Sequence, residues 1–311
     1  MPSLAVYDVH IITHTFLNCN SFLNFYYNIF TKDINCAKIT VIYKWKREAR
    51  MKKEYNLISI ISAFARSFFV LGLFLIVPSV ISFIFKLIIK DDVSYNQASV
   101  PIMMASYVVV ILIFTALYKI IGFRLFDVVG LKMIKPSICI SSAFLGIGAY
   151  GIIQALIVLL SFVLPKSWVG LQNEHSSALL GGSMVVAIIY TVLIAPLCEE
   201  LVFRGLITCA LYDNVPKILT ILVPAVLFSL IHLPSPIALL YTLILGLVLG
   251  FIRLRTNSLV PCVLIHSFFN LTNYMLFIPN QIGLYIVWGI SLPLVIIAII
   301  NIIKQTRNKG L

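Results

Sequence analysis

The sequence predicts an all-α, polytopic membrane protein with about eight transmembrane helices. Of the 311 residues, 61% are hydrophobic and only 11% are charged, and the mean hydropathy is +1.05. A soluble domain carries roughly a quarter of charged residues, so this chain lacks the polar side chains to cover a water-facing surface. The net charge of +12 comes from basic residues that fall between apolar runs. This pattern predicts a lipid bilayer as the surroundings and no nucleic-acid partner.

Eight apolar stretches approach the roughly 20 residues that a bilayer-spanning helix needs. They are centred near residues 68–85, 101–119, 138–164, 183–211, 217–233, 236–252, 258–278 and 283–303.

The basic residues predict the orientation of these stretches. Nineteen Lys and Arg residues lie before the first stretch, in the even-numbered gaps and after the last stretch, whereas the other gaps hold only Lys86, Lys90 and Lys166. Cytoplasmic segments carry the excess of basic residues, so both termini are expected in the cytoplasm. The Ile-, Asn- and Lys-rich composition is typical of an AT-rich bacterium. We therefore expect a multi-pass protein of the bacterial cell membrane.

Residues 1–50 differ from the remainder, because Asn, Thr, His and Tyr are mixed through weakly apolar runs. Met51-Lys52-Lys53 then leads directly into the first strong apolar stretch. One hypothesis is that translation starts at Met51 and that residues 1–50 are a misassigned start. The alternative is a genuine cytoplasmic tail. In both cases residues 51–311 form a multi-pass membrane domain.

Ionisable side chains are rare inside the apolar stretches. A charge in hydrocarbon costs from a few to more than about ten kcal/mol, so each such residue is a functional candidate. They are Glu199, Glu200 and Arg204 in the fourth stretch, His232 in the fifth, and His266 in the seventh, where Asn270 is a polar companion. All six aspartates lie outside confident stretches, which argues against an aspartyl intramembrane protease. The serine and zinc signatures GxSG and HExxH are absent as well.

The rise of an α-helix, 1.5 Å per residue, places these groups at a common depth. Glu199 lies about 20 Å along its helix from the turn at residues 212–216, and His232 lies about 24 Å along the next, antiparallel helix. On the seventh stretch, His266 and Asn270 lie about 14 and 20 Å from Asn257. Three helices are therefore expected to bring their polar groups to one layer.

Helical spacing then distributes the chemistry. Glu200 and Arg204 are separated by four residues, share a face and are expected to pair, whereas Glu199 points about 100° away and is free to act as a general base. His266 and Asn270 share a face and suit an oxyanion on an attacked carbonyl. With His232 helping Glu199 to activate water, these groups predict peptide-bond hydrolysis.

Simpler interpretations remain open for each residue. A lone intramembrane His is often a packing residue, a Glu–Arg pair is often just neutralised, and Asn270 alone is consistent with a contact between helices. The agreement in depth and chemical type favours a site. Gly246 and Gly250, a GxxxG pair, are interpreted as close helix packing.

Three strings carry a resemblance to a known family. Glu199-Glu200-Leu-Val-Phe-Arg204 is similar to an EExxxR motif, Phe228-Ser-Leu-Ile-His232 to FxxxH, and His266-Ser-Phe-Phe-Asn270 to HxxxN. In this order, the chain resembles the type II CaaX prenyl endopeptidases and the bacteriocin-processing (Abi, CPBP) intramembrane proteases. The resemblance covers about residues 180–275, the expected protease core.

The resemblance implies a helical membrane core with a cavity open to the cytoplasm. It implies that Glu199 and His232 activate water, that His266 and Asn270 hold the oxyanion, and that Glu200, Arg204 and Phe228 support the site. The expected partner is a peptide or membrane-protein substrate, in bacterial peptide processing or bacteriocin immunity.

No cofactor is expected. Zinc is the alternative, with Glu199, His232 and His266 as its ligands, because two His and one Glu are a set that zinc binds. A metal-free glutamate mechanism is favoured, since Asn270 is a poor zinc ligand and Arg204 adds repulsion.

A second class of function stays open. Glu199 and His232 also suit a proton relay in a proton-coupled transporter, and a membrane immunity protein acts by binding alone. Transporters often show repeated halves with broken helices, and the sequence has no such symmetry.

Overall fold

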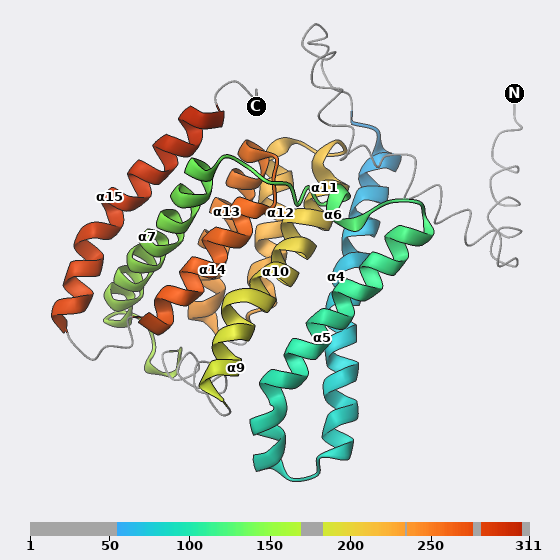
Figure 1. Cartoon of the computed structure of the whole chain (residues 1–311), viewed down its shortest axis with the longest axis horizontal. Coiled ribbons are helices and arrows are strands. Elements are labelled where there is room, and N and C mark those ends of the chain that lie inside the picture. Colours follow the sequence, from blue (N-terminus) through green and yellow to red (C-terminus); the bar gives the residue numbers. More distant parts are fainter. Residues whose placement is uncertain (1–54, 169–182, 234, 276–280, 307–311) are drawn as a thin grey trace, which may run out of the picture.

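The computed structural model describes residues 55–168, 183–233, 235–275 and 281–306, with the side chains of residues 275 and 281–287 left out. Within these ranges all regular secondary structure is helical and there is no strand (Figure 1). The all-α prediction is confirmed. Residues 1–50, on which the hypothesis of a start at Met51 depends, lie outside the described ranges.

The described helices occur in the following order along the chain. They are α4 (Leu57–Ile88), α5 (Asp92–Ile120), α6 (Leu125–Val128), α7 (Pro136–Ser161), α9 (Met184–Ile189), η1 (Tyr190–Ile194), α10 (Ala195–Glu200), η2 (Leu201–Ile207), α11 (Thr208–Tyr212), α12 (Lys217–Leu230), α13 (Pro236–Thr256), α14 (Val260–Met275) and α15 (Gln281–Thr306).

Six helices in the described part of the chain are long and apolar enough to cross a membrane, which confirms a multi-pass membrane protein. They are Leu57–Ile88, Asp92–Ile120, Pro136–Ser161, Met184–Tyr212, Pro236–Thr256 and Trp288–Thr306. The fifth and seventh predicted stretches form shorter helices, α12 with 14 residues and α14 with 16. At 1.5 Å per residue these measure about 21 and 24 Å, less than the roughly 30 Å of a hydrocarbon core. The number of eight spans and the cytoplasmic termini therefore stay predictions.

Two of the nineteen cations that predicted the orientation lie inside the protein. Arg204 is fully buried and Arg253 is 5% exposed. Because both side chains are buried in the protein, these two residues do not indicate which side of the membrane their segments face.

Helix pairs build the bundle around the fourth apolar stretch. α4 packs on α5, α12 on α13, and α7 on both α14 and α15, with the α4–α5 pair extending away from the other helices (Figure 1). Gly246 and Gly250 of α13 face Ala225 and Ile221 of α12, where an added Cβ would lie 3.1 and 2.9 Å from the nearest atom. This contact confirms the prediction of close helix packing.

The fourth apolar stretch is one continuous helix from Met184 to Tyr212 with two π-helical turns, η1 and η2. The first turn directly precedes Pro196, which has no N–H to donate and therefore interrupts the regular ladder. Such π turns inside α-helices are frequent at functional sites. Glu199 and Glu200 lie between the two turns, in α10, and Arg204 lies within the second turn, η2.

Candidate active site

A fully buried ion pair lies at the centre of the bundle. Arg204 Nη1 donates to Glu200 Oε1 at 3.0 Å, as the spacing of four residues predicts. Arg204 Nη2 donates to the carbonyl oxygen of Gly246 at 3.2 Å, and the guanidinium lies 4.5 Å from the centre of the Phe228 ring. Because a buried charge needs partners, these contacts explain how an arginine is accommodated in an apolar core.

Glu199 takes no part in that pair and has its own partners. Its Oε1 accepts a hydrogen bond from the hydroxyl of Tyr107 at 3.3 Å, and its Oε2 lies 3.8 Å from Nε2 of His266. Only 8% of the residue is exposed. The carboxylate therefore points away from Arg204, as predicted, toward a histidine from another helix.

His266 connects the two glutamates. Its Nδ1 lies 3.0 Å from Glu200 Oε1, while its Nε2 faces Glu199. Because the carboxylate of Glu200 accepts, Nδ1 is the donor in this contact. The residue lies in the interior with 4% exposure. His266 thereby brings α14 into contact with α10, and the depth of these groups in a bilayer stays a prediction.

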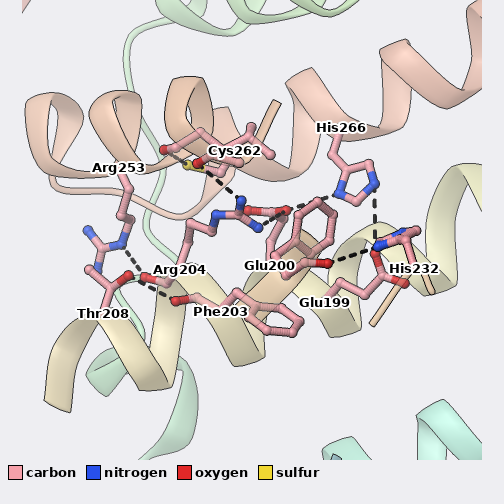
Figure 2. A network of polar contacts seen from close by, with 12 residues as sticks. Glu199, Glu200, Phe203, Arg204, Thr208, His232, Arg253, Cys262 and His266 are labelled. Carbon is pink, nitrogen blue, oxygen red and sulfur yellow. Dashed lines mark hydrogen bonds and ion pairs between the residues drawn. The ribbon is translucent and has the colours of Figure 1, made fainter. Parts of the chain in front are cut away.

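His232 follows the end of α12 and lies against the same aromatic ring as His266. The Phe228 ring contacts the imidazole of His232 edge to face at a centroid distance of 5.0 Å, and that of His266 at 5.6 Å. Nδ1 of His232 lies 2.8 Å from the carbonyl oxygen of Phe228. Figure 2 shows Glu199, His232 and His266 at one end of the polar network.

Asn270 makes a hydrogen bond to the helix that carries Glu199. Its Nδ2 donates to the carbonyl oxygen of Thr191 at 2.8 Å, and its part in holding an oxyanion with His266 stays a prediction. In η1 the N–H of Ala195 bonds to Tyr190, which skips Thr191, and Pro196 has no N–H. Asn270 satisfies this skipped carbonyl, because a buried carbonyl needs a partner.

The second π turn leaves a carbonyl to another side chain in the same way. The N–H of Thr208 bonds to Gly205 and Phe203 and skips Arg204. Nε of Arg253 on α13 donates to that Arg204 carbonyl at 2.9 Å, visible in Figure 2.

Two residues of this network are not predicted from the sequence. Arg253 follows the sixth apolar stretch, 236–252, and resembles a loop cation, but α13 continues to Thr256 and buries it. Tyr107 lies within the second stretch, 101–119, where no motif or charge marks it. Arg253 lies three residues before the last residue of α13, so the exact end of the helix is the signal that would have placed it inside the protein.

The zinc alternative places a metal between Glu199, His232 and His266. Among the residues that the structure describes, no group of three His, Cys, Asp or Glu side chains is arranged to hold a metal ion. Nδ1 of His266 already faces Glu200, which leaves Nε2 as its free ligand atom.

Comparison with known proteins agrees with the resemblance in the sequence. The model of the type II CAAX prenyl endopeptidase Rce1-like family matches residues 181–272, a region that contains all three motifs.

Two relatives match a similar length of chain. A protein of Mycoplasma capricolum subsp. capricolum named "Uncharacterized protein" is 38% identical over 104 residues, 31% of this chain and 29% of that protein. A Bacillus subtilis protein named "Putative membrane peptidase YdiL" is 29% identical over 104 residues, 33% of this chain and 42% of that protein. The chain thus spans less than half of the length of either relative. No solved structure matches. The family match and the second relative support a membrane protease.

Proposed function

We propose that the chain is an intramembrane endopeptidase that hydrolyses a peptide bond with Glu199 as the general base. The observation that carries this proposal is the buried contact between the carboxylate of Glu199 and the imidazole of His266. This contact lies next to the Glu200–Arg204 ion pair, in which Glu199 takes no part. A carboxylate that is held in a water-poor core but is not neutralised by its neighbour's cation is available to take a proton.

In the proposed reaction, a water molecule enters beside Glu199 and His232. Glu199 removes a proton from the water as the oxygen attacks the peptide carbonyl, and the carbonyl oxygen gains the negative charge. The same carboxyl group then gives the proton to the leaving nitrogen as the carbon–nitrogen bond breaks. His232 orients the water, and the edge of Phe228 holds its imidazole.

The oxyanion would be stabilised by His266 and Asn270. One N–H of the Asn270 amide is used by Thr191, and the other remains available because a primary amide has two. Since Nδ1 of His266 faces Glu200, Nε2 is the ring nitrogen that would face the oxyanion. Glu200 thereby fixes the orientation of the imidazole and supports the site.

We propose a mechanism that needs no metal. In support, Arg204 places a positive charge within the same network, and Asn270 is a poor zinc ligand. Activity that survives exhaustive treatment with a chelator would support this, and a loss of activity restored specifically by zinc would overturn it.

The proposed substrate is a peptide or a membrane-protein segment that reaches the site from the bilayer or its surface. The setting that we propose is the bacterial cell membrane, in peptide processing or bacteriocin immunity. The support is the family match and the composition of the chain.

The test is the Glu199→Gln variant of the full chain, purified in detergent and incubated with a defined library of synthetic peptides. The library includes peptides with a prenylated cysteine, and cleavage is read by mass spectrometry. Asp92→Asn, the same chemical change at the exposed α4–α5 connection, is the matched control. We expect Glu199→Gln to lose at least about a hundredfold in rate, the scale of general-base catalysis, while Asp92→Asn keeps the parent rate.

The outcome also separates the rival classes. Cleavage by Glu199→Gln at the parent rate would refute the protease proposal. If a protective phenotype in cells survives in Glu199→Gln while the membrane level of the protein is unchanged, the biological role is binding and not cleavage.

A further inference from the structure

Glu199 has a hydrogen-bond partner from outside the region that matches the family. Tyr107 lies on α5, 92 positions before Glu199, whereas the match covers residues 181–272. None of the three motifs contains it, and α5 pairs chiefly with α4. Its hydroxyl nevertheless reaches the carboxylate proposed as the general base.

Tyr107 is held by contacts from three elements, two with its ring and one with its backbone. It lies 5.3 Å from the Phe74 ring of α4 and 5.7 Å from the Tyr190 ring of η1. The thiol of Cys198, on α10, lies 3.7 Å from the carbonyl oxygen of Tyr107. With 7% exposure, the side chain has little freedom, so the position of its hydroxyl follows from helix packing.

The two carboxylate oxygens of Glu199 have different neighbours. The Tyr107 hydroxyl donates to Oε1 at 3.3 Å, and Oε2 lies 3.8 Å from Nε2 of His266. The first distance is longer than the roughly 2.5–3.0 Å of ordinary hydroxyl bonds. Catalytic hydrogen bonds are often long without substrate and tighten in the reacting complex. A donor on Oε1 leaves Oε2 as the oxygen that faces the histidine.

We propose that Tyr107 is a positioning residue for the general base. It holds the Glu199 carboxylate so that Oε2 is directed at the water and His266, and its hydrogen bond favours the ionised form that accepts the proton. This inference rests on the proposed function of Glu199. It assigns to α5 a part in the reaction, in addition to its packing on α4.

Other groups also act on the charge of Glu199 and must be considered beside Tyr107. From the elements packed around it these are His266 of α14, Glu200 and Cys198 of α10, Arg204 of η2, Tyr190 of η1, and His232 after α12. Tyr107 acts beside them as a neutral donor whose hydroxyl makes a hydrogen bond to the carboxylate. Removing its hydroxyl leaves every one of the other groups in place.

The test is Tyr107→Phe, which keeps the ring contacts with Phe74 and Tyr190 and removes the hydroxyl, with its hydrogen bonds to Glu199 and to the Tyr190 side chain. Tyr118→Phe is the control: Tyr118 lies on the same helix, is equally buried, and is about 16 Å away along the axis. We expect Tyr107→Phe to lower kcat about three- to tenfold, the effect of one lost hydrogen bond. KM should change less than twofold, because Tyr107 does not contact substrate.

The pH dependence of kcat/KM distinguishes positioning from a general structural role. Without the donor the ionised carboxylate is less favoured, so the acidic limb of the profile should move to higher pH in Tyr107→Phe and stay in place in Tyr118→Phe. The shape of the profile does not depend on how much enzyme is folded, so a partial loss of protein does not hide the result.

A parent-like kcat and an unmoved acidic limb in Tyr107→Phe would overturn the inference. So would an equal loss of kcat in both variants with no shift of the limb, which would indicate packing alone. If Glu199→Gln is inactive while Tyr107→Phe behaves as the parent, the proposed function stands and only the role of Tyr107 falls. If Glu199→Gln is active, the proposed function itself fails.

Discussion

A single carboxylate oxygen contacts both a guanidinium and an imidazole at the centre of the molecule. Oε1 of Glu200 lies 3.0 Å from Nη1 of Arg204 and 3.0 Å from Nδ1 of His266. Both Glu200 and Arg204 are fully buried, and among the described residues Oε2 of Glu200 has no hydrogen-bond partner. Glu200 therefore binds one side chain of its own membrane helix, Arg204, and one side chain of α14, His266.

Removing this charge should destabilise the protein strongly. Glu200→Gln keeps the shape but leaves Arg204 as a buried cation without a carboxylate, which costs about 3–5 kcal/mol. We expect a lower midpoint of thermal unfolding in detergent. The double variant Glu200→Gln/Arg204→Met removes both charges and should recover part of the loss. A double variant no more stable than Glu200→Gln would show that the lost pairing is not the cause.

At this scale the sequence predicts pairs within one helix but not partners from distant helices. The Glu200–Arg204 pair follows from the spacing of four residues alone. The hydrogen bond of Asn270 does not, because its acceptor is a carbonyl that becomes available only where a π turn skips Thr191. Tyr107 likewise reaches Glu199 through packing of α5, which no local pattern encodes.

Two π turns organise the helix that carries the motif residues. Each turn skips one carbonyl of the regular ladder, and a side chain from another helix takes it: Asn270 bonds to Thr191 and Arg253 to Arg204. Arg253 also donates to the carbonyl oxygen of Val129, before α7, at 3.1 Å. The irregular turns thereby connect the motif helix to α13 and α14. Sequence periodicity predicts the helix but not these turns, and Pro196 is the one local sign of them.

The contact between α7 and α14 depends on a glycine next to the site. A Cβ on Gly146 would lie 2.4 Å from the carbonyl oxygen of Ile265, the residue before His266. Gly146→Ala must therefore displace backbone, and overpacking of this kind costs about 1–3 kcal/mol or more. We expect a lower unfolding midpoint and a reduced cleavage rate, because α14 is pushed away from Glu200.

Gly72→Ala is the matched control for this substitution. Gly72 lies on α4, and a Cβ there meets nothing within 4 Å. The variant should unfold at the parent temperature and keep the parent rate. Equal stability of Gly146→Ala and Gly72→Ala would contradict the close approach of α7 and α14.

For the whole molecule, low charge predicts the class and the distribution of cations predicts the orientation. Six described helices are suited to span a membrane. Two others are shorter: α12, which ends just before His232, and α14, which contains His266. Hydropathy alone did not predict this difference, because it measures apolar length and not where a helix ends. The orientation of α4, α5 and α7 does not depend on whether these short helices span fully, whereas the side on which the C-terminus lies does.

The prediction of cytoplasmic termini places the α4–α5 connection outside the cytoplasm and the segment before α7 inside it. Lys90 and Lys132 lie in these two segments and are exposed. In intact bacterial cells, a cysteine at Lys90 should react with a membrane-impermeant maleimide, whereas a cysteine at Lys132 should react only after permeabilisation. The parent chain corrects for its native cysteines. The reverse pattern would mean an inverted protein, and labelling of both sites in intact cells would mean that α5 does not cross the membrane.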